Sequence, residues 1–165
     1  MKKIMVVMGS DSDLPVMEKA IDTLKDLNVP YTVHVLSAHR TPDETRKAAS
    51  EAEANGYGVI IAAAGMAAHL AGAFAAGTVL PVIGIPVKSS CFDGMDALLS
   101  TVQMPPGMPV ATVGVNAAKN AALLACQIIA LDEPELTERL KAMREDNKKK
   151  ILEKNGEVNK KYSNI

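Results

Sequence analysis

The chain has 165 residues, a length that suggests one domain, or one domain with a tail. Hydrophobic residues make up 48% and charged residues 22%, which is the composition of a globular protein rather than a disordered one. Aromatic residues make up only 3% and the net charge is −1, which excludes an aromatic or basic platform for nucleic acid as the main design. The two cysteines form no CxxC motif, and no apolar run reaches the ~18 residues of a membrane span. We therefore expect a cytoplasmic protein with no metal site, no nucleic-acid partner and no membrane anchor.

Short apolar runs alternate with helical patterns along the chain. Runs rich in β-branched residues predict five strands, at 3–8, 31–36, 58–62, 81–85 and 109–115. Apolar residues at helical spacing predict helices between and after them, at 15–28, 42–55, 67–76, 96–102, 116–130 and 134–154. This alternation favours an α/β fold, a single three-layer, doubly wound (flavodoxin-like) domain built on a five-stranded parallel sheet.

The end of the chain differs in composition from the rest. The core is expected over about residues 3–130, and a C-terminal helix with a basic tail over about 134–165. From Arg144 onward seven residues are basic and four are acidic. We interpret this tail as a solvated helix face that ends in a frayed terminus. The preceding helix, 116–130, is apolar nearly all round, so we expect it to be buried on more than one side.

Ligands of doubly wound folds bind beyond the carboxyl ends of the strands, so the loops there are the candidate site. The first loop is GSDSD, residues 9–13, directly before a helix. The hydroxyls of Ser10 and Ser12, backbone N–H groups and the helix N-terminus suit an anion. Asp13 is placed to cap the helix or to accept hydrogen bonds from sugar hydroxyls, and a plain turn with a capping Asp fits equally well. Neither a GxGxxG motif nor a P-loop is present.

The second loop, SAHRTP at residues 37–42, holds the best candidate for chemistry. Imidazole groups give and take a proton near neutral pH, which makes His39 a candidate general acid and base. The guanidinium of Arg40 suits a phosphate or carboxylate. Thr41 is the expected N-cap of the next helix, with Pro42 at its first position. His34 lies within a strand pattern, and we interpret it as structural.

The third and fourth loops carry weaker signals. AAGMAAHLAG, residues 63–72, has small residues that allow close backbone approach, and it includes Gly65 and His69. Tight packing explains such a segment as well as a ligand does, and His69 is more typical of a satisfied, partly buried histidine. The fourth loop, residues 87–94, is polar, and Lys88 is either a solvated lysine or a contact to an anionic substrate. Cys91 has no base partner within reach in the sequence, which disfavours a nucleophile.

These motifs together resemble the PurE family. GSDSD, SAHRTP and AGMAAHL follow three consecutive predicted strands, and LPVIGIPV, LLSTVQMPPGMPVATV and NAALLA continue the match over about residues 3–130. The resemblance implies an isomerase (mutase) that converts 5-(carboxyamino)imidazole ribonucleotide to 4-carboxy-5-aminoimidazole ribonucleotide in de novo purine (IMP) biosynthesis. It implies no cofactor, a small-molecule ribonucleotide substrate, and a homo-octamer with active sites at subunit contacts.

The resemblance also implies roles for single residues. His39 matches the proton-transfer histidine, and the other matching positions bind the ribonucleotide: Ser10, Ser12, Asp13, Arg40, Gly65 and His69. The chain departs from Gly-rich versions of the third loop, which have Gly at the positions of Ala63 and Met66 and Pro at that of Ala71. A side chain at Met66 is expected to narrow the pocket or to alter loop motion, without abolishing activity.

Other functions stay open at this point. A direct aminoimidazole ribonucleotide carboxylase of the same fold is disfavoured, because such enzymes carry Lys at the position of Arg40 and lack the AAHL motif. A non-catalytic, flavodoxin-like module for FMN or another phosphorylated ligand would explain GSDSD, but it leaves His39 and Arg40 unexplained. A scaffold that acts through its basic tail would depend on residues 155–165.

Overall fold

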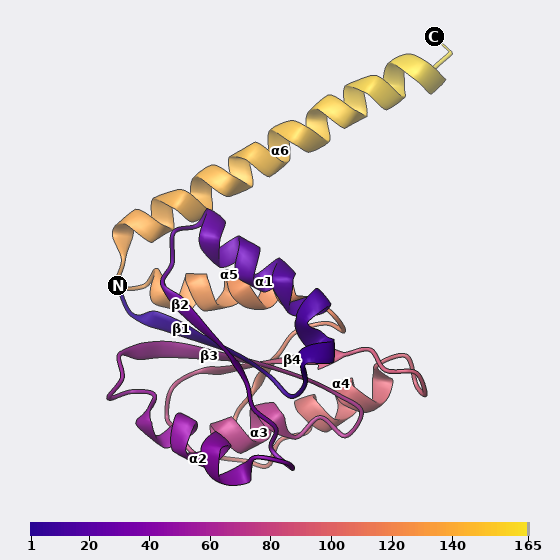
Figure 1. The fold of residues 1–165 in the computed structure, drawn as a ribbon. Helices are drawn as coiled ribbons and strands as arrows, with labels where there is room; N and C mark the ends of the chain where they lie inside the picture. The colour runs from indigo at the N-terminus through magenta and orange to yellow at the C-terminus, as the bar shows by residue number, and fades with distance from the viewer. Residues whose placement is uncertain (165) are drawn as a thin grey trace.

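The computed structural model describes residues 1–164 and is built around a five-stranded parallel sheet (Figure 1). The strand order is β2-β1-β3-β4-β5, the order of flavodoxin-like folds, as the alternating pattern predicted. The strands are β1 (Lys3–Met8), β2 (Tyr31–Val35), β3 (Tyr57–Gly65), β4 (Val82–Val87) and β5 (Ala111–Thr112). The order reverses between β1 and β3, so ligands are expected at the carboxyl ends of these two strands.

The fifth strand is shorter than the sequence pattern indicates. Only Ala111 and Thr112 pair regularly with β4, although the expected run was 109–115. The N–H groups of Val113 and Asn116 still donate to Gly84 O (3.1 Å) and Pro86 O (2.9 Å). The segment therefore follows β4 with irregular spacing, and it delivers Asn116 to the carboxyl end of the sheet.

Helices cover both faces of the sheet and bury two separate apolar layers. The short helix η1 (Asp11–Asp13) leads into α1 (Leu14–Asp26), which packs with α5 (Ala118–Ile129) on one face. The other face is covered by α2 (Pro42–Glu51), α3 (Leu70–Ala75) and α4 (Met95–Val102). α5 contacts the sheet, α1 and α6, which confirms its expected burial on more than one side, although Lys119, Asn120 and Gln127 are exposed.

One helix start and one helix cap differ from the prediction. α3 begins at Leu70 rather than at residue 67, because Met66 has a positive φ of 55° and the chain bends before the helix. α2 begins at Pro42 as expected, but Thr41 makes no side-chain capping bond. The Thr41 hydroxyl instead accepts from Ser37 N–H (2.8 Å) and donates to Ser37 O (3.1 Å). Thr41 therefore closes the turn that carries His39 and Arg40.

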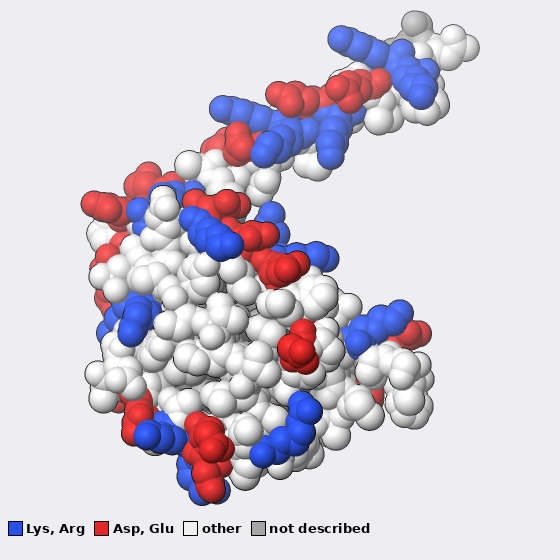
Figure 2. Space-filling model, viewed as in Figure 1, with Lys and Arg blue, Asp and Glu red and all other residues white. Residues whose placement is uncertain are grey.

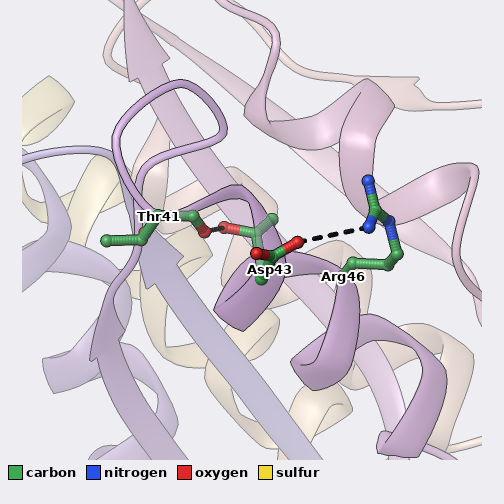
Figure 3. Close-up of polar contacts among 4 residues, drawn as sticks. Thr41, Asp43 and Arg46 are labelled. Carbon is green, nitrogen blue, oxygen red and sulfur yellow. Dashed lines mark hydrogen bonds and ion pairs between the residues drawn. The ribbon is translucent and has the colours of Figure 1, made fainter.

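The first turns of α2 are stabilised by other contacts (Figure 3). Thr45 Oγ1 donates to Thr41 O (2.8 Å), and Arg46 pairs with Asp43 (3.3 Å) on the exposed side of the helix. Asp43 and Glu44 also lie in the first turn, where negative charge complements the helix dipole.

The last helix, α6 (Pro134–Tyr162), extends eight residues beyond its expected end at Lys154 and projects from the body (Figure 1). Leu136 and Leu140 anchor its first half in the core. Its second half exposes Ile151, Leu152, Val158 and Tyr162 among many charged side chains (Figure 2). The frayed terminus expected from the sequence is thus helical to Tyr162. None of the helices of residues 1–164 is long and apolar enough to cross a membrane.

Candidate active site

The carboxyl ends of β1, β2, β3 and β4 surround an open cavity of about 680 Å³. This volume lies within the ~300–1,000 Å³ typical of small-molecule sites. All seven predicted site residues line it: Ser10, Ser12, Asp13, His39, Arg40, Gly65 and His69. The strand register explains this convergence, since Met8 lies opposite Val35 and Ala63, and Gly65 opposite Val87.

The loop after β1 forms a cluster of hydroxyl groups at the switch in strand order. Ser12 Oγ donates to Ser10 Oγ (2.9 Å), and Ser12 N–H also points to that oxygen (3.3 Å). The side chains of both serines line the cavity directly ahead of α1. Hydroxyl donors and the N-terminal end of a helix together suit a phosphate group.

Asp13 is buried at the start of α1, with only 9% of its surface exposed. It stands at the N-cap position but makes no side-chain capping bond, so the expected capping role is wrong. Burial raises the pKa of its carboxyl group, and the Ser10 backbone only partly offsets this effect. A buried carboxylate that does not serve its own helix remains available to accept hydrogen bonds from a ligand.

Arg40 is oriented by contacts with the loops that follow β1 and β2. Its Nη2 donates to Gly9 O (2.8 Å), and its Nε and backbone N–H both point to Ser37 Oγ (3.4 and 3.2 Å). The guanidinium thus lies beside the hydroxyl loop, where positive charge complements an anion. Ser37 was missed as a contributor, and its position at the start of SAHRTP was the available signal.

His39 and His69 meet across the cavity. Nε2 of His39 lies 2.7 Å from Nδ1 of His69, with ring centroids 4.9 Å apart and ring planes at 80°. One ring nitrogen donates and the other accepts, which leaves Nδ1 of His39 and Nε2 of His69 available to a ligand. The prediction that His69 has a hydrogen-bond partner is confirmed, and that partner is the candidate catalytic residue. The predicted partial burial is wrong, because His69 is exposed at the cavity.

The loop after β3 forms the third wall of the cavity. Met66 is 63% exposed and adopts a left-handed conformation that Gly adopts without strain. A Cβ on Gly65 would lie 3.2 Å from Val87 O, so this position is confined by β4. Ala71 lies in the first turn of α3, which tolerates the Pro of other family members, and it does not line the cavity.

The loop after β4 contributes Lys88 and Ser89 to the cavity. Lys88 Nζ pairs with Asp93 Oδ1 at 2.7 Å, and its backbone N–H donates to Asn116 Oδ1 (2.9 Å). The contact with Asn116 was not predicted, because Asn116 is 28 residues from Lys88. Cys91 is exposed and does not line the cavity.

One other prediction concerns a residue outside the cavity. His34 hydrogen-bonds with Thr32 (2.8 Å), which in turn contacts the Tyr57 hydroxyl (2.9 Å), as a structural histidine would. Among residues 1–164, no group of three His, Cys, Asp or Glu side chains is arranged to hold a metal ion.

Comparisons with known proteins agree with this fold. The profile of the AIR carboxylase family matches residues 3–150. N5-carboxyaminoimidazole ribonucleotide mutase of Pyrococcus abyssi is 56% identical over 149 residues, which cover 90% of this chain and 86% of that protein. The same-named protein of Thermotoga maritima is 50% identical over 154 residues, with 93% and 90% coverage.

Longer proteins and solved structures match as well. The chloroplastic phosphoribosylaminoimidazole carboxylase of Vigna aconitifolia is 49% identical over 154 residues, but these span only 28% of that protein. A crystal structure of Treponema denticola PurE superposes with a TM-score of 0.85 at 31% identity, covering 98% of this chain and 99% of that one. The chain therefore belongs to the AIR carboxylase family, which is the PurE family that its loop motifs resemble.

Proposed function

We propose that the protein is a mutase that converts 5-(carboxyamino)imidazole ribonucleotide to 4-carboxy-5-aminoimidazole ribonucleotide in purine biosynthesis. The observation that carries the proposal is the His39–His69 pair beside an anion-binding loop, in one cavity at the switch in strand order. Relatives at 50–56% identity over most of both chains bear the name of this mutase, which supports the same reaction.

The geometry supports a role for His39 as proton donor and acceptor. Protonated His39 gives its proton to the carbamate nitrogen, and the N–C bond breaks with release of carbon dioxide and an exocyclic amine. The ring carbon then attacks the carbon dioxide, and neutral His39 removes the hydrogen from that carbon. The proton returns to His39 at the end, so atoms and charges balance over the cycle.

His69 serves as the positioning residue for His39. The 2.7 Å contact occupies one nitrogen of the His39 ring and fixes the ring so that Nδ1 faces the ligand. Carbon dioxide that stays confined next to the imidazole ring of the substrate reacts because it is close to the ring carbon, so the reaction needs no high concentration of carbon dioxide in solution. The small side chains and the glycine of the loop after β3 leave room for a flat ring close to the backbone.

The remaining site residues bind the ribonucleotide. Ser10, Ser12 and Arg40 surround the place for the phosphate, since their donors converge at the N-terminal end of α1. Asp13 accepts hydrogen bonds from the ribose hydroxyls, and Gly65 allows close approach at the third wall.

The reaction itself provides the test. Purified protein is mixed with 5-(carboxyamino)imidazole ribonucleotide, without ATP or added metal, and the absorbance of the ring-carboxylated product is followed. A parallel sample contains aminoimidazole ribonucleotide and bicarbonate. We expect fast conversion in the first sample alone. Conversion only in the second sample would identify a carboxylase. No conversion in either sample would favour a phosphate-ligand-binding module.

We also propose a cytoplasmic homo-octamer, as the family resemblance implies. Apolar side chains stand exposed along one face of α4 and its entry loop, at Phe92, Met95, Leu99 and Val102, and a second set lies on α6. Such patches are typical of interfaces. Cys91 and Cys126 are both free thiols, which is usual in a reducing compartment. Sedimentation that shows a monomer at working concentration would contradict the assembly.

A further inference from the structure

Lys88 stands at the rim of the cavity, on the opposite side from Arg40. Arg40 follows β2 and Lys88 follows β4, with the ends of β1 and β3 between them. Arg40 is already engaged beside the hydroxyl loop, through Gly9 and Ser37. The cavity thus has two cationic groups at separate ends, and only one of them is built into the loop that suits a phosphate.

The backbone of Lys88 is fixed, although its side chain is not. Its N–H donates to Asn116 Oδ1 at 2.9 Å. Asn116 itself adopts a positive φ of 57°. A Cβ on Gly94 would lie 3.2 Å from Lys88 Cα and 2.6 Å from Val115 Cγ1, so the loop closes tightly upon Lys88. The ammonium group is therefore attached to a backbone position that is held in place.

The side chain of Lys88 is held by one exposed carboxylate. Lys88 Nζ and Asp93 Oδ1 are 2.7 Å apart, and the two side chains are 55% and 84% exposed. The Lys88 ammonium lowers the pKa of Asp93, so the partner is ionised at neutral pH. An ion pair in this exposed setting is weak, and an anion inside the cavity competes with it readily.

We propose that Lys88 recognises the carboxylate of the substrate, and that Asp93 holds the ammonium group until the substrate takes its place. The inference rests on the proposed function, whose substrate carries two anionic groups, a phosphate and a carboxylate. Arg40 and the serine hydroxyls account for the phosphate, and Lys88 is the cation that remains. Asp93 then competes for the Lys88 ammonium group, so that ligands without a carboxylate do not bind to Lys88 at this end of the cavity.

The test compares two ligands that differ in the carboxylate alone. Equilibrium binding of aminoimidazole ribonucleotide and of 4-carboxy-5-aminoimidazole ribonucleotide is measured for the wild type, Lys88→Met and Lys88→Arg. Lys88→Met is expected to weaken binding of the carboxylated ligand roughly tenfold, the loss of one charge-assisted contact, and to leave the other ligand within about twofold. Lys88→Arg restores most of the loss. Lys119→Met, which removes an exposed lysine outside the cavity, is the matched control and changes neither affinity.

Asp93→Asn tests the competition. Asn tolerates the positive φ of 53° at this position, so the loop keeps its conformation. We expect about two- to threefold tighter binding of the carboxylated ligand in Asp93→Asn, because the exposed pair is weak. The same change in the Lys88→Met background has no effect on either ligand. An equal gain in both backgrounds would overturn the competitor role.

The outcomes separate this inference from the proposed function. If the wild type binds both ligands and Lys88→Met binds both as tightly, Lys88 makes no contact and the inference is wrong. If Lys88→Met weakens both ligands equally, Lys88 serves the phosphate instead, and the carboxylate assignment is wrong. If the wild type binds neither ribonucleotide, the proposed function fails and the inference fails with it.

Discussion

His39 Nε2 lies 2.7 Å from His69 Nδ1, although the two histidines are 30 residues apart in the sequence. One follows β2 and the other precedes α3 after β3, so the contact spans the end of β1. A hydrogen bond between two imidazoles needs one donor and one acceptor. The pair therefore shares one hydrogen bond in the cavity that Ser10 and Ser12 also line.

The first prediction concerns turnover. Replacing His39 with Asn removes the group that gives and takes the proton, and we expect kcat to fall about 10²- to 10⁴-fold. Binding of the ring-carboxylated product should persist, because Arg40 and the serine hydroxyls are untouched. Absorbance assays and equilibrium binding measure the two quantities separately. A His39→Asn enzyme that retains the wild-type rate would contradict the mechanism.

His69 is predicted to act through His39 rather than on the substrate. His69→Asn should lower kcat by roughly 10- to 100-fold with little change in KM, since the loss of orientation costs less than the loss of the acid–base group. The double variant should be no slower than His39→Asn alone. Additive losses in the double variant would show that His69 has an independent catalytic role.

Asp13 gives the protein a stability that depends on pH. Burial raises the pKa of its carboxyl above the ordinary 3.8, so the folded state binds more protons than the unfolded state between the two pKa values. The free energy of unfolding therefore falls as pH rises through this window. Asp13→Asn cannot ionise, and its advantage over the wild type should grow from pH 3.8 toward neutrality.

Urea denaturation at several pH values measures this effect. Asp132→Asn, which changes an exposed carboxylate, serves as the control and should show no such trend. An Asp13→Asn difference that is constant with pH would mean that the burial of Asp13 does not penalise its charge. If Asp13→Asn unfolds at higher urea but binds the ribonucleotide more weakly, Asp13 is a site residue that lowers the stability of the fold.

Two glycines should respond to alanine in opposite directions. A Cβ at Gly84 in β4 would overlap Thr101 Cγ2 and lie 3.0 Å from Val110 Cγ1, so Gly84→Ala should destabilise the fold by about 1–3 kcal/mol. Gly156, inside α6, has nothing within 4 Å of its Cβ position, and alanine there favours the helix by about 0.8–1.0 kcal/mol. Thermal denaturation tests the first change, and hydrogen exchange along α6 tests the second.

The apolar side chains of α6 predict how the chain assembles. Ile151 and Leu152 are 63% and 59% exposed, and replacing both with Glu should shift the protein to smaller species in sedimentation. Helical content should change little, since Glu is a good helix former. Lys149→Glu alters an exposed charge nearby and is expected to leave assembly intact. Unchanged sedimentation of the Ile151/Leu152 variant would remove α6 from the proposed interface.

The sheet could be predicted from the sequence because strands buried on both faces need unbroken apolar runs, as in residues 4–8 and in Val82–Val87. The ends of the helices were harder to predict from the sequence. Asn155 and Gly156 are typical of a helix end, yet α6 continues through them, supported on its exposed side by pairs such as Lys150–Asp146 at 3.0 Å. The hydroxyl of Thr41 hydrogen-bonds with Ser37 in the preceding turn instead of capping α2, and this contact depends on how that turn folds.

The site could be predicted as a set of residues but not as a set of contacts. All seven site residues that were predicted from the loops after the strands line the cavity. The contact of His39 with His69 depends on the order and register of β2, β1 and β3, and no local pattern encodes it. The Lys88–Asp93 pair depends on two consecutive left-handed residues, Asp93 and Gly94.

The pairing of two histidines also makes this site visible to magnetic resonance. The chain contains three histidines, so its imidazole signals are few, and single substitutions assign them. His34 hydrogen-bonds with Thr32 outside the cavity and supplies an internal reference in the same spectrum. In isotopically enriched protein, the ring-nitrogen chemical shifts of His39 and His69 would then report which nitrogen carries the proton as ligand is added, without any chemical probe attached to the site.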